Sequence, residues 1–413
     1  MKGKGTILLK GGLLVSRGSS SRSDILVADG VISRIAPDIA ADCADRVIDV
    51  TGCVVSYGLA DVHVHFREPG FSAKETIATG AMAAARGGYT TVCPMPNLNP
   101  APDCLEHLQV ELDLIRDEKA CIEVKPFATI TSSRKGGSVV DMAAMKDKVA
   151  GFSDDGSGVQ NTGVMESAML MAASEDKIIS AHCEDTDQAP FSPESEWKQV
   201  TRDVELAREI GCRYHVCHVS TKESVAAVRR AKAAGAQVSC ETAPHYLTLT
   251  QADRTDEGRF RMNPPLREAE DRDALIEGIK DGTVEVIATD HAPHTAEEKS
   301  RGYNANAMGI VGLETAFPVL YTKLVRSGAI SIDTLFELMC DNPRRIFRLG
   351  GCLAEGEAAD IAVFDIREEY TIDSSTFLSK GHSTPFDGWK VHGKCILTLK
   401  DGTPVYLDER FRP

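Results

Sequence analysis

The chain has 413 residues, of which 42% are hydrophobic and 26% are charged, and its formal net charge at pH 7 is −15. This composition is typical of a soluble globular protein that is large enough for two domains, or for one barrel with an appendage. The acidic balance disfavours anionic partners, namely nucleic acids and membrane surfaces, although a local basic pocket can still hold an anionic metabolite.

Cysteine usage and the length of the apolar runs bear on location. The twelve cysteines show no Cys-x-x-Cys spacing, and several lie in apolar runs, where a thiol acts as a small hydrophobic side chain. No apolar run is long enough for a signal peptide or a transmembrane helix. We therefore expect a cytoplasmic protein with reduced thiols.

The two ends of the chain are rich in short β-like runs. Residues 1–55 contain the turn signal Asp29-Gly30, and residues 355–413 contain another at Asp401-Gly402. Because chain termini often lie close together, we expect both segments to form one composite β domain, a small β-sandwich.

Residues 56–354 differ, because apolar strand-like runs alternate there with longer segments of helical period. The eight candidate strands are residues 59–65, 89–94, 121–130, 149–154, 178–183, 213–219, 236–243 and 284–289. This pattern predicts a (β/α)8 TIM barrel. An open doubly wound sheet is the second reading, and the lack of Gly-x-Gly-x-x-Gly after the first strand disfavours it.

Histidines gather at the predicted carboxyl ends of the strands, where parallel barrels carry their chemistry. Six of the eleven histidines lie there: His63, His65, His182, His218, His291 and His294. Aspartates follow the fourth strand (Asp154, Asp155) and the eighth (Asp290). Mixed nitrogen and oxygen donors suit zinc, with iron, cobalt or manganese as alternatives, and an aspartate beside a metal-activated water can act as a general base.

Other polar residues have different interpretations. Arg67 follows the His63-x-His65 pair and offers a bidentate clamp for an anion. We interpret His215 as structural and His245 as either a support for the ligands or a turn residue. A serine hydrolase is disfavoured because the chain has no Gly-x-Ser-x-Gly motif.

Motifs between residues 61 and 315 resemble the amidohydrolase superfamily and, within it, the bacterial dihydroorotase family that is related to the multifunctional animal enzyme. The motifs are Asp61-Val62-His63-Val64-His65-Phe66-Arg67, Met95-Pro96-Asn97, Phe152-Ser153-Asp154-Asp155-Gly156, His215-Val216-Cys217-His218, Met262-Asn263-Pro264-Pro265, Ala288-Thr289-Asp290-His291-Ala292-Pro293-His294 and Gly312-Leu313-Glu314-Thr315. The resemblance implies reversible ring closure of N-carbamoyl-L-aspartate to L-dihydroorotate, a step of pyrimidine synthesis.

The resemblance also implies roles for single residues. His63 and His65 would hold the buried metal, His182 and His218 a second metal, and Asp290 would be both a ligand and the general acid/base. The substrate α-carboxylate would be held by Arg67, Asn97 and His294, and the amide edge of the ring by Asn263.

The end of the fourth strand separates this chain from several relatives. Hydantoinases, allantoinases and animal-type dihydroorotases carry a carbamate-modified lysine there, whereas this chain has Asp154-Asp155. The resemblance favours Asp155 as the ligand, but the residue pattern alone leaves Asp154 open, and with it the choice between one and two zinc ions.

Two alternative functions follow from the same residues. One is a cyclic amidase of the hydantoinase or allantoinase type, and the other is a non-catalytic scaffold for aspartate transcarbamoylase, which is also a candidate partner of an active enzyme. For the oligomeric state we expect a homodimer, the commonest arrangement.

Overall fold

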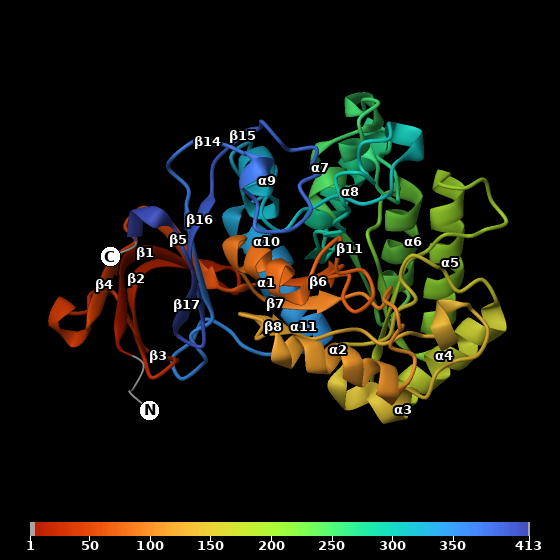
Figure 1. The fold of residues 1–413 in the computed structure, drawn as a ribbon, viewed down its shortest axis with the longest axis horizontal. Helices are drawn as coiled ribbons and strands as arrows, with labels where there is room; N and C mark the ends of the chain where they lie inside the picture. Colours follow the sequence, from red (N-terminus) through yellow and green to blue (C-terminus); the bar gives the residue numbers. More distant parts are fainter. Residues whose placement is uncertain (1–4, 412–413) are drawn as a thin grey trace.

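The computed structural model describes residues 5–411, which form a barrel of parallel strands and a second sheet beside it (Figure 1). The sheet combines strands from both ends of the chain, in the order β17-β16-β13-β5-β1-β2-β3, and β4 pairs with β1. Its strands are β1 (Ile7–Ser16), β2 (Ser19–Ala28), β3 (Val31–Ala36), β4 (Arg46–Asp49), β5 (Cys53–Tyr57), β13 (Ile361–Asp365), β16 (Lys394–Lys400) and β17 (Thr403–Leu407).

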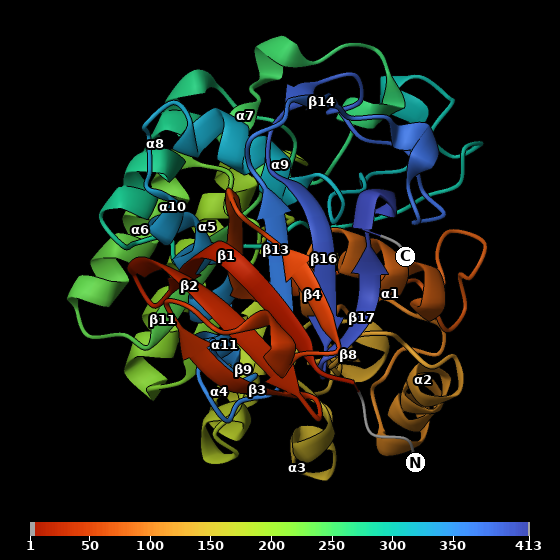
Figure 2. The same cartoon turned by 90° about the vertical axis from the view of Figure 1, so that its left-hand side faces the viewer.

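The two ends meet where β13 pairs antiparallel with β5, so that strands from the start and the end of the chain lie side by side (Figure 2). Asp29 and Gly30, like Asp401 and Gly402, adopt the positive φ angles that tight hairpins require, and they join β2 to β3 and β16 to β17. A β domain built from both ends is therefore confirmed. Its exact boundaries stay a prediction, and β5 runs two residues past residue 55.

The barrel strands are all parallel. They are β6 (Leu59–Val64), β7 (Tyr89–Pro94), β8 (Glu123–Val124), β9 (Ile178–Ala181), β10 (Arg213–Val216), β11 (Val238–Thr242) and β12 (Val286–Ile287). Phe152 occupies the fourth position as a single bridge residue between Ala128 and Ile179, and a bridge from Val64 to His291 closes the ring. The predicted barrel is thus confirmed, with shorter third, fourth and eighth strands than the apolar runs indicated.

Helices cover the outside of the barrel. They are α1 (Ile77–Arg86), α2 (Leu105–Asp117), α3 (Met142–Met145), α4 (Thr162–Ser174), α5 (Pro193–Ile210), α6 (Lys222–Ala233), α7 (Pro244–Thr248), α8 (Ala269–Lys280), α9 (Ala316–Leu320), α10 (Ile332–Phe336) and α11 (Asn342–Phe347). Helix α1 packs between the barrel and the sheet, where the Thr398 hydroxyl donates a hydrogen bond to the carbonyl of Ala85 (2.7 Å). None of the helices within residues 5–411 has the length and apolar character needed to cross a membrane.

A segment of the C-terminal part reaches back over the barrel. Between β13 and β16 the chain forms the short pair β14 (Tyr370–Thr371) and β15 (Lys390–Val391). Its Ser379 hydroxyl donates to Glu75, and its Ser383 carbonyl accepts from the Val311 amide (3.0 Å). Glu75 contacts His291 at 3.4 Å, so this segment braces the loop that follows the eighth strand.

Candidate metal centre

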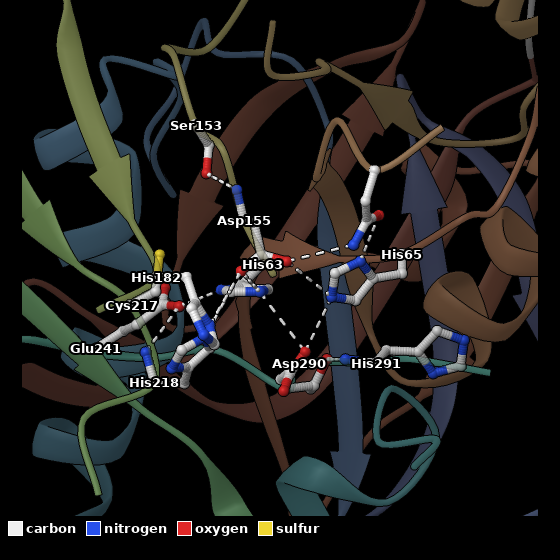
Figure 3. Close-up of polar contacts among 12 residues, drawn as sticks. His63, His65, Ser153, Asp155, His182, Cys217, His218, Glu241, Asp290 and His291 are labelled. Atoms are coloured by element: carbon white, nitrogen blue, oxygen red, sulfur yellow. Dashed lines mark hydrogen bonds and ion pairs between the residues drawn. The ribbon is translucent and has the colours of Figure 1, made fainter. Parts of the chain in front are cut away.

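Six buried side chains from five strand ends converge at the carboxyl-terminal mouth of the barrel (Figure 3). They are His63, His65, Asp155, His182, His218 and Asp290, the same six that the sequence nominated as metal ligands. Parallel strands end at one rim of a barrel, which is why residues up to 227 positions apart in sequence become neighbours here.

Asp155 lies at the centre of this cluster. Its Oδ1 atom is 3.4 Å from His63 Nε2, 3.6 Å from His218 Nε2 and 3.9 Å from His182 Nδ1, and its Oδ2 atom is 3.6 Å from His65 Nε2. One carboxylate therefore faces histidines on both sides, the arrangement that a ligand shared by two cations needs.

Asp290 completes the other side of the cluster. Its Oδ1 atom lies 3.1 Å from His65 Nε2 and 3.6 Å from His63 Nε2. Two donors held at about 2.1 Å by one tetrahedral zinc ion lie about 3.4 Å apart. The separations of these donors therefore match ligands of a common ion.

The two adjacent aspartates have different surroundings. Asp154 turns away from the cluster and accepts hydrogen bonds from the Ile130 amide (2.8 Å), the Thr131 amide (3.1 Å) and the Thr131 hydroxyl. Asp155 alone of the pair contacts the histidines. Asp154 thus fastens the loop after the third strand, and Asp155 stays the predicted ligand of the two.

The electrostatics of the cluster favour a cation. Burial alone raises the pKa of Asp155, but the facing His63 and His218 hold it well below its usual range. Burial lowers the pKa of His63, yet Asp155 and Glu241 raise it well above the ordinary value. The carboxylates are therefore ionised, and they attract positive charge strongly in this water-poor site.

Two buried atoms without hydrogen-bond partners in the part of the chain that the structure describes indicate that a metal ion fits this cluster. His63 Nε2 and Asp155 Oδ1 are buried and have no hydrogen-bond partner among the described residues. Leaving such atoms unpaired costs about 1–3 kcal/mol each. A cation between them would satisfy both, and the nitrogen and oxygen donors present are those that zinc accepts.

The backbone turns sharply where three of the site residues follow their strands. Arg67, His218 and Asp290 have φ angles of 61°, 34° and 48°, in the left-handed region that non-glycine residues seldom adopt. Each such residue costs of the order of 1–3 kcal/mol. The left-handed turn offsets this cost by orienting the side chain toward the mouth of the barrel instead of along the pleat of the strand.

Arg67 and His294 lie together beside the cluster. Arg67 Nε donates to the Pro293 carbonyl (3.2 Å), and its Nη2 atom lies 3.4 Å from His294 Nε2. Burial, Arg67 and Lys74 lower the pKa of His294 to about 4, so its ring is neutral at pH 7. Lys74 is itself paired with Glu298 at 2.9 Å, so the Arg67 guanidinium is the group of this corner that suits an anion.

The two asparagines of the predicted site are also near the cluster. Asn97 Oδ1 lies 2.9 Å from His65 Nδ1, and Asn97 Nδ2 donates to Asp155 (3.4 Å). Asn263 Nδ2 donates to Glu184 (3.1 Å), whose carboxylate lies 3.2 Å from His182. Both asparagines therefore also steady the side chains around the metal centre.

Sequence reasoning missed two carboxylates beneath the cluster. Glu241 on β11 contacts His63 and His215, and Asp61 on β6 accepts hydrogen bonds from the Thr289 amide and hydroxyl. The available signal was a charged residue inside a strand that is buried throughout. His215, interpreted as structural, faces Glu241 and not the cluster.

Two further histidines, His245 and His291, do not join the cluster. His245 is buried against Tyr246, and burial lowers its pKa to about 4. His291 contacts Glu75 behind the site. Neither makes a contact with the six clustered side chains that the described structure records.

The chain resembles known proteins over nearly its whole length. A family sequence model described as dihydro-orotase-like matches residues 52–192. A dihydroorotase of Bacillus cereus (strain B4264) is 46% identical over 407 residues, covering 94% of this chain and 95% of the relative. A dihydroorotase of Fusobacterium nucleatum subsp. nucleatum is 45% identical and covers 98% and 99% of the two chains.

Among solved structures, L-hydantoinase from Arthrobacter aurescens matches with a TM-score of 0.88 at 26% identity, covering 97% of this chain and 96% of that one. Dihydropyrimidinase from Brevibacillus agri NCHU1002 matches with a TM-score of 0.87 at 22% identity, covering 98% and 95%, and shows the fold alone. Because relatives at 46% identity span almost the entire chain, the chain belongs to the dihydroorotase family.

Proposed function

We propose that this enzyme is a zinc-dependent dihydroorotase that interconverts N-carbamoyl-L-aspartate and L-dihydroorotate in pyrimidine synthesis. The observation that carries the proposal is the convergence of six potential ligands next to the Arg67–His294 corner. The cluster would support hydrolysis, and the pair Arg67 and His294 would favour a substrate that carries a carboxylate.

The metal centre would be held by the six clustered side chains. His63, His65 and Asp290 form one group of donors, and Asp155 links it to His182 and His218. A zinc ion bound there supplies Lewis acidity, which activates water near neutral pH and polarises a carbonyl. We infer space for two ions, with Asp155 in the place that a modified lysine takes in hydantoinases.

Asp290 is the residue that moves the proton. The facing histidines outweigh burial and lower its pKa, so the carboxylate is ionised at neutral pH, as a proton acceptor must be. In hydrolysis it takes a proton from the attacking water and gives it to the ring nitrogen that leaves. In ring closure it takes the proton of the attacking ureido nitrogen as the C–N bond forms and passes it to the carboxyl oxygen whose C–O bond breaks. That oxygen takes a second proton from solvent and leaves as water.

Arg67 and His294 would bind the α-carboxylate. A guanidinium offers two parallel N–H donors to a carboxylate, and charged hydrogen bonds of this kind are stronger than neutral ones. Hydantoin and allantoin have no carboxylate and gain nothing from this pair. Asn97 beside the cluster would complete the carboxylate site, and Asn263 would meet the amide edge of the ring.

The alternative functions have weaker support. The hydantoinase fold match is at lower identity than the dihydroorotase relatives, and a neutral substrate leaves Arg67 without a role. A scaffold for aspartate transcarbamoylase needs no ligand cluster, yet all six donors are in place.

The test is an assay of purified protein of measured metal content with dihydroorotate, hydantoin and allantoin side by side. We expect turnover of dihydroorotate that exceeds the others, is lost after chelation and returns with zinc. Preference for hydantoin, or metal-replete protein that leaves dihydroorotate unchanged, would contradict the proposal. The homodimer, the transcarbamoylase partner and the cytoplasmic location stay predictions.

A further inference from the structure

We propose that Glu241 is a positioning residue that fixes the ring of His63, so that the Nε2 atom of that ring is the one presented to the metal. The inference rests on the proposed metal site but assigns a role to a residue outside the ligand set. Glu241 lies on β11, a barrel strand whose end contributes no ligand to the cluster.

The carboxylate of Glu241 contacts two of the candidate ligand residues, one on β6 and one that follows β10. Glu241 is 1% exposed, and its Oε1 atom lies 2.6 Å from His63 Nδ1. The same oxygen accepts the backbone N–H of His218 at 3.4 Å. Glu241 therefore touches the ring of a ligand on β6 and the backbone of a ligand that follows β10.

The second oxygen of Glu241 is also occupied. Oε2 lies 3.2 Å from His215 Nε2, and His215 Nδ1 lies 2.7 Å from the Ser239 hydroxyl. Because an ionised carboxylate only accepts, His63 Nδ1 and His215 Nε2 must both be donors, and a neutral His215 ring then accepts from the Ser239 hydroxyl. The chain of contacts from Ser239 to His63 thus has one consistent direction.

The direction of these hydrogen bonds determines which ring nitrogen of His63 can bind a metal ion. A neutral imidazole carries one proton, and when that proton sits on Nδ1 the Nε2 lone pair is free to bind a cation. His63 Nε2 is the atom that faces Asp155 and Asp290, and it has no hydrogen-bond partner among the described residues. Without Glu241 the proton could reside on Nε2, and the ring could rotate.

A ligand role for Glu241 is the competing explanation, because His63, Cys217 and Glu241 also lie close enough together to share an ion. Two observations disfavour it. Both oxygens of Glu241 already accept hydrogen bonds, and the Cys217 sulfur pairs with the Ser180 hydroxyl at 3.1 Å. Glu241 acts on the metal through His63.

The test measures zinc affinity by competition with a chelator in Glu241→Gln and Glu241→Ala. Loss of such a support costs about 10–100-fold in metal affinity. We expect Ala to show the larger loss, because Gln keeps an acceptor for the Nδ1 proton and removes only the charge. The visible absorption spectrum of the cobalt-substituted protein should change in Ala and be largely restored in Gln.

Controls separate this role from a general effect of a buried carboxylate. Glu111 on α2 is 2% exposed and lies outside the cluster, so Glu111→Gln should bind zinc as the unaltered protein does. If Glu241→Ala fails to fold, His215→Asn tests the same chain from its other end and should weaken zinc binding less. Folded Glu241→Ala and Glu241→Gln with unchanged affinity and cobalt spectrum would overturn the inference. Unaltered protein that binds no zinc would instead overturn the proposed metal site, before any variant is measured.

Discussion

His63 Nε2 and Asp155 Oδ1 lie 3.4 Å apart at the centre of the barrel mouth, and within residues 5–411 neither atom has a hydrogen-bond partner. Burying either atom alone is unfavourable, and a cation held between the two would offset that cost. The pair thus explains why Asp155 and its neighbour Asp154, similar in sequence context, should respond differently to mutation.

Replacing Asp155 by Asn should remove the shared carboxylate and with it most of the metal. We expect turnover to fall by at least about 100-fold, as when a metal centre loses a ligand's charge. Asp154→Asn is the matched control, because it should retain zinc and cost about 1–3 kcal/mol in the free energy of unfolding through its hydrogen bonds to Ile130 and Thr131. Metal analysis, kinetics and denaturant unfolding of both variants check this, and equal metal loss in both would contradict it.

Asp290→Asn should separate metal binding from proton transfer. An amide oxygen can still face His65, so part of the metal should stay, but an amide cannot accept the proton. Turnover should therefore fall by about 10²–10⁴-fold, the range that general acid–base catalysis contributes. The measurement is kcat per bound zinc; a near-normal value would remove Asp290 from the mechanism.

Arg67→Gln should affect substrates according to their charge. Losing a charged hydrogen bond of about 1.5–3 kcal/mol corresponds to roughly a 10–100-fold drop in kcat/KM for dihydroorotate. Any residual turnover of hydantoin should change little, because that ring has no carboxylate. The measurement is kcat/KM for both substrates with one preparation of the variant. An equal drop for both substrates would indicate a structural role for Arg67.

Glu111 should make the stability of the wild-type protein decrease with rising pH. Burial raises its pKa well above the ordinary value of 4.5, and its Oε2 atom has no hydrogen-bond partner in the described part of the chain. A carboxyl group with a raised folded-state pKa contributes most below pH 4.5, and this contribution is lost as the pH rises toward the folded-state pKa. Glu111→Gln should therefore raise the melting temperature at pH 8 and have a smaller effect at pH 5. The same shift at both pH values would rule out this titration.

Much of the fold could be predicted because its signals are local. The Asp29-Gly30 and Asp401-Gly402 pairs mark hairpins by their own backbone preferences, and alternating strands and helices mark the barrel. The clustering of the six candidate ligands could also be predicted, because parallel strands end at one rim. The lengths of the strands could not be predicted, because a buried apolar run looks alike whether its backbone is paired or only packed.

The details of the site lay beyond the sequence for a physical reason. The choice between Asp154 and Asp155 depends on where strand alternation stops, and the left-handed turns at His218 and Asp290 redirect side chains in a way that no spacing rule describes. The role of Glu241 depends on which residue faces it across three strands, which is set by tertiary packing alone.

The pairing of β5 with β13 has a consequence for synthesis on the ribosome. The ribosome synthesises the chain from its N-terminus, so some 300 further residues must be added after β5 before its partner strand β13 exists. During that interval the edge of β5 is open, and open edges invite pairing with other chains. Chains that terminate before Asp365 lack a complete β13. In such chains the edge of β5 stays unpaired, and premature termination should therefore lead to aggregation.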